Sequence, residues 1–252
     1  YSHKAIDLRI NEVLEVVGLT GYEYRYPSEL SGGQQQRVSL ARMLAVKPSI
    51  LLMDEPLSNL DAKLRNNLRI ELKRLHSTTG NTIIYVTHDQ VEAMSLSTDV
   101  AVMNEGSIQD LGSPRKVYHD PANIFVADFM GNPYMNLVKS EIIVKDDGIQ
   151  ACALEGELSI PVVNDFVSVG QKVTVGFRPE EVKICPSKGY GKAKVHAVLG
   201  TGADLLVTLR SSDILITARA DNKAIFNMDQ KVYFSVDPKV INIFDTNSGR
   251  SV

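Results

Sequence analysis

Ser31, Gly32 and Gly33 stand immediately before a run of strong helix formers, which continues from Gln34. The first N–H groups of a helix have no partner within the helix, and the macrodipole places roughly half a positive charge there. A serine can cap this end, and glycines let an anion approach the exposed N–H groups closely. The stretch predicts an anion site with phosphate as its usual occupant, although an ordinary N-cap is the commoner explanation of Ser-Gly-Gly alone.

Two adjacent acids, Asp54 and Glu55, follow the apolar run at 49–53. A short unbroken apolar run is typical of a parallel strand buried on both faces, and ligands of open α/β sheets bind at the carboxyl ends of such strands. In an ATPase, one carboxylate there helps to hold Mg²⁺ and another polarises the attacking water. Taken alone, the two acids are more simply read as solvated loop residues.

A second strand-like run at 82–87 leads directly to His88. A histidine at this place can donate a hydrogen bond to a phosphate oxygen or orient a catalytic carboxylate, although a lone histidine is more often a packing or capping residue. Asp61, at the end of the segment 58–61, is well suited to cap the helix that follows.

Residues 1–118 alternate helical and strand-like patterns, which indicates a parallel α/β sheet. An amphipathic helix at 6–17 ends at Gly18, and a long helix begins at Asp61 with leucines on one side. Residues 99–103 form a third strand-like run, and Asn104-Glu105-Gly106 predicts a hairpin turn.

The pattern changes after residue 119. A helical segment around 123–130 ends at Gly131, and beyond Pro133 short β-rich runs are separated by Gly, Pro, Asn and Asp. These runs predict an all-β domain of one or two small barrels. We therefore expect two domains, residues 1–130 and 131–252.

Composition excludes some classes of function. The 252 residues are 44% hydrophobic and 23% charged, values typical of globular domains, and the net charge of −3 gives no argument for a nucleic-acid partner. No apolar run approaches the roughly 18 residues of a membrane-spanning helix. Cys152 and Cys185 lack metal-type spacing, which favours a reduced pair over a disulfide.

The order of these motifs resembles the nucleotide-binding subunits of ABC transporters. LSGGQ at 30–34 is similar to the signature motif, ILLMDE at 50–55 to the Walker B strand, SNLD at 58–61 to the D-loop, and His88 to the switch histidine. The resemblance implies that Asp54 helps to hold Mg²⁺, that Glu55 is the general base, and that His88 contacts the γ-phosphate of ATP. In that family two subunits pack head to tail, so that Ser31, Gly32, Gly33, Gln34 and Asp61 act across the dimer.

The resemblance extends to one subgroup. YVTHDQVEAMSLSTDVAVMNEGSIQDLGSP, FVADFMGNPYMN, FRPEEV and IFDTNSG are similar to subunits of carbohydrate importers of the maltose and glycerol-phosphate type. This implies the C-terminal part of a P-loop NTPase-type nucleotide-binding domain, followed by a regulatory domain of oligonucleotide-binding-like barrels. It also implies transmembrane permease partners and a cytoplasmic subunit peripheral to the inner face of the plasma membrane.

One departure from the family pattern is large. No G-x-x-x-x-G-K-[ST] loop occurs in the sequence, and the family's glutamine loop and adenine-stacking aromatic are absent too. We therefore expect an N-terminally truncated subunit that is not competent alone. Alternatives are an importer ATPase for polyamine, iron or an oxyanion, or a non-catalytic dimerisation fragment whose C-terminal domain binds a regulatory protein or small ligand. The sequence does not identify the transported solute.

Overall fold

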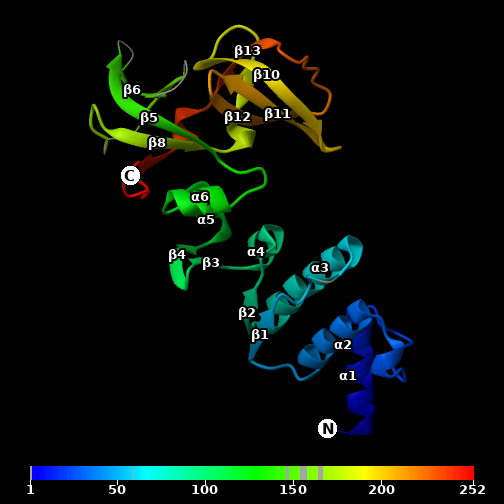
Figure 1. Cartoon of the computed structure of the whole chain (residues 1–252). Helices are drawn as coiled ribbons and strands as arrows, with labels where there is room; N and C mark the ends of the chain where they lie inside the picture. Colours follow the sequence, from blue (N-terminus) through cyan, green and yellow to red (C-terminus); the bar gives the residue numbers. More distant parts are fainter. Residues whose placement is uncertain (1, 59, 146–147, 154–157, 164–166) are drawn as a thin grey trace. The chain divides into compact units, whose positions relative to one another are not determined.

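The computed structural model describes residues 2–58, 60–145, 148–153, 158–163 and 167–252, coloured along the sequence in Figure 1. The chain divides into two compact units, Tyr1–Thr98 and Asp99–Val252. The functional division expected at residues 130 and 131 stays a prediction, because a boundary between compact units marks sparse contacts and not a change of function.

The first unit contains the stretches singled out above for chemistry. Its described elements are, in order, α1 (His3–Val16), η1 (Pro27–Glu29), α2 (Gly32–Ala45), β1 (Ile50–Asp54), α3 (Ala62–Thr79), β2 (Thr82–Val86) and α4 (Gln90–Leu96). The starts of α2 and α3 are those predicted from sequence. Ser31 is the N-cap of α2, and Asp61 is the N-cap of α3, where its side chain accepts a hydrogen bond from the N–H of Leu64.

Strands β1 and β2 pair in parallel, with Asp54 opposite Val86, so their carboxyl ends lie at the same edge. The prediction that both strands are buried on two faces is wrong for this structure. Leu51 and Met53 point into the core, whereas Leu52 is 66% exposed and Ile84 is 54% exposed. The physical reason is that the helices of this unit pack against one face of the two-stranded sheet, with Leu51, Met53, Leu68 and Leu72 in one apolar cluster. An unbroken apolar run therefore does not by itself mean cover on both sides.

The second unit begins with a hairpin and two short helices and continues as β structure. Its described elements are, in order, β3 (Val100–Asn104), β4 (Ser107–Gly112), α5 (Pro114–His119), α6 (Ile124–Phe129), β5 (Asn136–Lys145), β6 (Gly148–Ala153), β7 (Ser159–Pro161), β8 (Lys172–Phe177), η2 (Pro179–Glu181), β9 (Lys183–Cys185), β10 (Gly191–Gly200), β11 (Asp204–Ser211), β12 (Ile214–Asp221), β13 (Lys231–Ser235), η3 (Pro238–Val240) and β14 (Asn242–Asp245).

The hairpin turn predicted at 104–106 is confirmed. Strand β3 pairs antiparallel with β4, and Glu105 and Gly106 both have positive φ, at 47° and 76°, as a type I′ turn requires. The expectation that the third strand-like run belongs to the parallel sheet is wrong for the described residues. Among them, β3 pairs with β4 in a separate two-stranded sheet.

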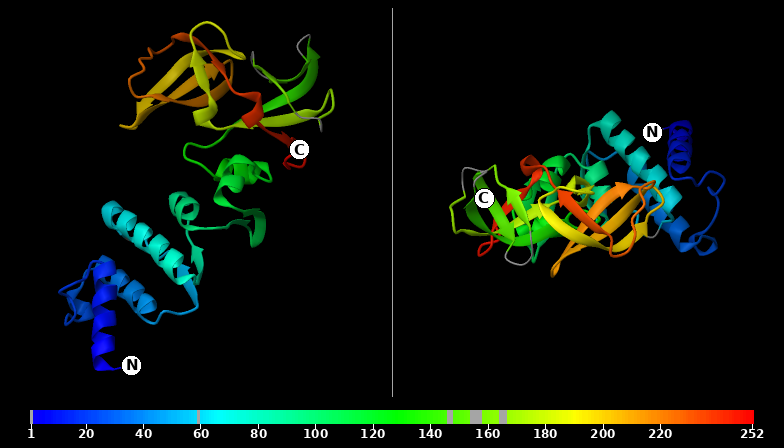
Figure 2. Two further views of the ribbon diagram at one scale, coloured as in Figure 1. Left: turned by 180° about the vertical axis from the view of Figure 1, so that it is seen from behind. Right: turned by 90° about the horizontal axis from the view of Figure 1, so that it is seen from above.

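Two five-stranded sheets make up the rest of this unit. Their strand orders are β12-β11-β10-β13-β9 and β14-β8-β5-β6-β7. Figure 2 shows β5 and β8 on one side of this unit and β10 to β12 on the other. Side chains of both sheets, including Val175 and Phe234, contribute to one apolar core. Neither sheet closes on itself in the described part of the chain, so an all-β region is established and the barrels are not. Cys152 and Cys185 are free thiols.

Arg178 fastens the two short helices of this unit to its sheets. Only 3% of this residue is exposed, and its guanidinium donates to the carbonyl oxygens of Ala127 (3.1 Å), Met130 and Tyr118 (2.8 Å). The guanidinium also lies 4.1 Å from the centre of the Tyr118 ring. Burial, together with the hydrogen bond that Tyr118 donates to Glu180, raises the pKa of Tyr118 to about 12. The helices α5 and α6 therefore belong structurally to the second unit, Asp99–Val252, which we call the β unit.

Candidate functional site

The N-terminal end of α2 has the form expected of an anion site. Ser31 Oγ accepts from the N–H of Gln34 at 3.3 Å, and the Gln34 side chain accepts from the N–H of Ser31 at 2.8 Å, which forms a capping box. Both Ser31 and Gly32 are exposed, and Gly33 is half-buried. A Cβ built on Gly32 meets no atom within 4 Å, so the space beside the helix end is open. The described residues therefore leave room for a ligand beside Gly32.

Glu55 and His88 form a pair at the carboxyl edge of the parallel sheet. His88 Nδ1 lies 3.0 Å from Glu55 Oε1, and both side chains are accessible to solvent. The hydrogen bond with Glu55 raises the pKa of His88 above its ordinary value. The sequence placed each residue at the end of a strand, and the structure brings the two side chains together.

Glu55 is held in an unusual backbone conformation. Its φ is +44°, in the left-handed region that residues other than glycine seldom adopt. Its N–H donates to the Val86 carbonyl at 2.9 Å, and its carbonyl accepts from Ser58 Oγ at 3.0 Å. The chain leaves the direction of β1 at Glu55. The orientation of this side chain therefore depends on the turn and not on the up-and-down alternation of side chains along a strand.

Asp54 and Asp61 lie on either side of this turn. Asp54 is the last residue of β1 and is exposed, while Asp61 caps α3. Asn59, within the predicted D-loop, lies outside the described residues. In the described part of the chain, no group of three or more His, Cys, Asp and Glu side chains is arranged to hold a metal ion. A single exposed carboxylate still fits Mg²⁺, because that ion usually keeps several waters and takes one or two carboxylates together with substrate phosphates.

Arg65 holds the segment between Glu55 and Asp61, and sequence reasoning did not identify it. Its guanidinium donates to the carbonyls of Leu57 (3.3 Å), Ser58 (3.4 Å) and Leu60 (2.9 Å). One signal was available in the sequence, because an arginine four residues after a helix cap can reach back over the preceding loop. The carbonyls it binds could not be foreseen.

A second group missed from sequence lies beneath His88. Glu92 is only 2% exposed, and its Oε2 accepts hydrogen bonds from Tyr85 OH at 2.8 Å and from Thr87 Oγ1 at 2.9 Å. Burial and this hydrogen bond with Glu92 raise the pKa of Tyr85. A glutamate on a short helix is usually interpreted as solvated, so the burial of Glu92 could not be predicted from sequence.

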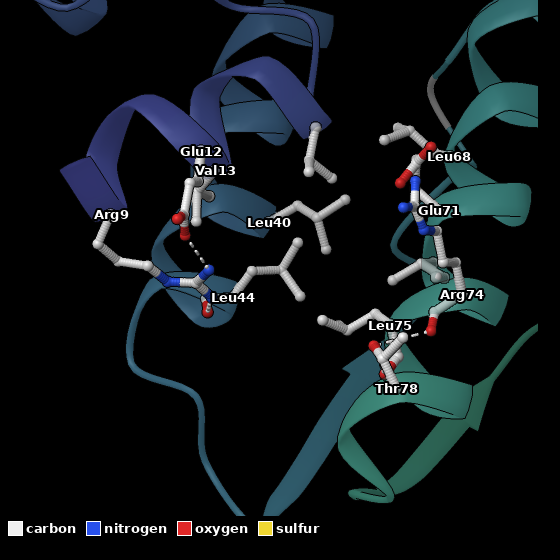
Figure 3. A pocket seen from close by; sticks show the side chains of 12 residues that line it. Arg9, Glu12, Val13, Leu40, Leu44, Leu68, Glu71, Arg74, Leu75 and Thr78 are labelled. Carbon is white, nitrogen blue, oxygen red and sulfur yellow. Dashed lines mark hydrogen bonds and ion pairs between the residues drawn. The ribbon is translucent and has the colours of Figure 1, made fainter.

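The first unit also contains a pocket of about 260 Å³ between α1, α2 and α3 (Figure 3). Apolar side chains such as Leu40, Leu44 and Leu72 line it, and Arg9 and Glu12 form an ion pair at its edge. None of the predicted site residues lines this pocket. The candidate site is therefore an exposed edge of the sheet and not a closed cavity.

None of the helices in the described part of the chain is long and apolar enough to cross a membrane.

A family model described as ABC transporter matches residues 3–58. The trehalose/maltose import ATP-binding protein MalK of Thermococcus litoralis is 42% identical, over 98% of this chain and 69% of that protein. The sulfoquinovosyl glycerol transport ATP-binding protein SmoE of Agrobacterium fabrum is 37% identical, over 96% of this chain and 68% of that protein. The sn-glycerol-3-phosphate import ATP-binding protein UgpC of Psychromonas ingrahamii is 34% identical, over 96% of this chain and 65% of that protein. The chain therefore belongs to the ATP-binding subunits of ABC transporters, in the carbohydrate-importer group.

Proposed function

We propose that this chain supplies the hydrolytic pair and the signature helix of a subunit that hydrolyses ATP to drive import of a carbohydrate. The observation that carries the proposal is the 3.0 Å contact between Glu55 and His88 at the edge where β1 and β2 end. Nucleotides bind at this edge in open α/β sheets. A carboxylate that is hydrogen-bonded to an imidazole is suited to accept a proton from water.

Each residue has a distinct task in this proposal. Glu55 accepts the proton of the attacking water, and His88 keeps the Glu55 carboxylate in one orientation through Nδ1. Protonation of His88, which the raised pKa favours, makes Nε2 a second N–H donor that can bind a phosphate oxygen. Asp54 would hold Mg²⁺, which neutralises charge on the phosphates when it is bound.

The N-terminal end of α2, which we call its mouth, acts on a different nucleotide from the one beside Glu55. We propose that Ser31, Gly32, Gly33 and Gln34 contact the γ-phosphate of ATP held by a second subunit packed head to tail, with Asp61 at the same interface. The open space beside Gly32 supports this arrangement, because a phosphate needs close access to the free N–H groups of the helix. The other partners are transmembrane permease subunits, which place the protein on the inner face of the plasma membrane.

The 252 residues contain no G-x-x-x-x-G-K-[ST] loop, so we propose that this chain alone does not hold ATP firmly enough to turn it over. Relatives with carbohydrate names favour a carbohydrate over polyamine, iron or an oxyanion as the solute. Residues 131–252 would form the regulatory domain, and its two five-stranded sheets would belong to oligonucleotide-binding-like barrels. It would bind a regulatory protein or small ligand.

A second candidate function is a non-catalytic fragment that dimerises and regulates, and the missing phosphate loop is the observation that favours it. Calorimetric titration with a slowly hydrolysed ATP analogue and Mg²⁺ separates the two. The 252-residue chain is compared with a longer form that carries a G-x-x-x-x-G-K-[ST] loop before residue 1. Binding and ATP turnover by the longer form support the proposed function. A longer form that binds no nucleotide would favour the regulatory fragment.

A further inference from the structure

Five side chains form a polar cluster beneath the turn that carries His88, and we call it the anchor cluster: Arg69, Tyr85, Thr87, Asp89 and Glu92. Its centre is the buried carboxylate of Glu92, whose Oε2 accepts from the hydroxyl groups of Tyr85 and Thr87 at 2.8 and 2.9 Å. A buried carboxylate is costly unless hydrogen bonds and opposite charge compensate for its lost hydration. The hydroxyl groups supply part of that compensation.

Arg69 on α3 supplies the opposite charge. Its side chain is 17% exposed, its Nη2 lies 3.4 Å from Asp89 Oδ2, and its Nε lies 3.9 Å from Glu92 Oε1. Arg65, one turn earlier on α3, lies 3.8 Å from the same Asp89 oxygen. Two arginines of α3 therefore form ion pairs with Asp89, the residue that caps α4.

The residues immediately before and after His88 are both fixed by this cluster. Thr87 Oγ1 donates to Glu92 and accepts from the N–H of Asp89 at 3.0 Å. Asp89 Oδ1 caps α4 by accepting from the N–H groups of Val91 (2.8 Å) and Glu92 (3.2 Å). His88 itself is 74% exposed at the side chain, so packing around the imidazole cannot explain its orientation.

We propose that Glu92 is a positioning residue for the switch histidine: through Thr87 it fixes the backbone on both sides of His88, so that the imidazole remains within hydrogen-bonding distance of Glu55. Glu92 does not touch the reacting atoms and acts only through the turn. Its importance for ATP hydrolysis rests on the proposed function. The positioning itself can be measured without any nucleotide.

The test is an NMR titration of the His88 imidazole in the 252-residue chain, with the signal assigned by its loss in His88→Asn. The hydrogen bond to Glu55 raises the pKa of His88, so this pKa reports whether the pair is formed. Carboxylates approach the imidazole from two segments: Glu55 after β1, and Asp89 and Glu92 on its own turn and helix. Glu55→Gln gives the pKa of His88 when its partner charge is lost.

Two variants at Thr87 separate position from charge. Thr87→Val keeps the side-chain shape and removes the hydroxyl, and Thr87→Ser restores the hydroxyl without changing any charge. We expect Thr87→Val to lower the pKa of His88 toward the Glu55→Gln value, and Thr87→Ser to keep it near the original value. Glu92→Ala removes both the acceptor and a nearby negative charge, so it should lower the pKa of His88 at least as far as Thr87→Val. Glu92→Gln removes the charge but keeps an acceptor, so it should lower this pKa less than Glu92→Ala.

The matched control is Ser95→Ala on the same helix, because that hydroxyl bonds to the helix's own Val91 carbonyl at 2.5 Å. It should leave the pKa of His88 unchanged. Circular dichroism shows whether each variant keeps its helices. If Glu92→Ala unfolds, the comparison of Thr87→Val with Thr87→Ser tests the proposal instead. An unchanged pKa in folded Glu92→Ala and Thr87→Val, beside a lowered one in Glu55→Gln, would overturn the positioning role and leave the proposed function intact. If Glu55→Gln has no effect either, the pair is not formed, and the proposed function loses its main support.

Discussion

His88 Nδ1 lies 3.0 Å from Glu55 Oε1, although 33 residues separate the two in the sequence. Parallel pairing of β1 and β2 brings both strand ends to one edge, and the hydrogen bond from the Glu55 N–H to the Val86 carbonyl fixes the turn there. The register of the two strands therefore brings the side chains of Glu55 and His88 together. The first prediction tests the role of Glu55 in this pair.

Glu55→Gln should preserve nucleotide binding and lower ATP turnover by about 10²-fold or more, because an amide cannot accept the proton of the attacking water. The change is made in a form of the subunit that carries a phosphate-binding loop, and steady-state phosphate release is measured. Glu15→Gln, an exposed position on α1, is the control and should leave turnover unaltered. Undiminished turnover in Glu55→Gln would remove this residue from the role of general base.

Ser31→Arg should prevent the mouth of α2 from serving a partner's nucleotide, since the long cationic side chain would occupy the open space beside Gly32. The assay mixes this chain with an intact subunit whose own signature serine is disabled. Without the substitution, the chain should restore measurable ATP turnover to the mixture. With Ser31→Arg it should not, whereas Ser39→Arg, exposed further along α2, should behave like the unsubstituted chain. Equal activity with and without Ser31→Arg would show that phosphate does not sit there.

Asp110→Asn should destabilise the β unit at neutral pH and have little effect in acid. Burial would raise the pKa of the Asp110 carboxyl, but hydrogen bonds from Lys116 and from the N–H groups of Ala122 and Leu111 outweigh burial and hold the pKa below its usual range. A lowered folded-state pKa contributes stability that is present above the unfolded value of about 3.9 and lost as the pH falls through the folded value.

The expected loss at pH 7 is about 1–3 kcal/mol, typical of hydrogen bonds to a charged group. It is measured by urea unfolding of the β unit at pH 7 and then at decreasing pH down to about pH 2, because the loss begins below the unfolded value and is complete only below the folded value. Asp128→Asn, on an exposed face of α6, is the matched control and should change stability little at either pH. A difference between Asp110→Asn and the original chain that stayed constant with pH would mean that charge on Asp110 contributes nothing.

Local features of this site could be predicted from the sequence because short-range rules determine them. Ser31 and Asp61 cap helices in the positions expected, and the hairpin at Glu105-Gly106 follows from its own residues. These features depend on backbone groups within a few residues. The order of the motifs was also visible in the sequence, because members of the family share the spacing between these motifs.

Features that depend on distant segments could not be predicted. The positive φ of Glu55 follows from hydrogen bonds to β2 and to Ser58, and the burial of Glu92 depends on Arg69 on another helix. The exposure of one face of β1 and β2 also could not be predicted, because the same apolar run occurs in strands covered on one face and in strands covered on both. The pairing of the later strands into two sheets with one core also could not be predicted, because short β-rich runs do not show which strands pair.

The two units should differ in resistance to protease. In the first, one face of the β1–β2 sheet leaves four large apolar side chains half or more exposed: Ile50 (58%), Leu52 (66%), Ile84 (54%) and Val86 (54%). Burying such a side chain fully is worth roughly 1.5–3 kcal/mol, while a whole domain is stable by about 5–15 kcal/mol. A sheet of two strands with an open apolar face therefore lacks a large part of the stabilisation that its sequence is suited to provide.

In the second unit both five-stranded sheets contribute to one core, and Arg178 ties α5 and α6 to it. We therefore predict that limited proteolysis of the 252-residue chain cuts first before about residue 130, and within residues 1–98 in particular. A resistant C-terminal fragment should remain, identified by mass spectrometry of a time course at low protease concentration. Arg178→Met offers a check within the same assay: it removes the donors that hold the short helices, so the start of the resistant fragment should shift beyond residue 130. Survival of an intact fragment of residues 1–98 while the β unit is digested would show that the open sheet face costs less than these burial energies imply.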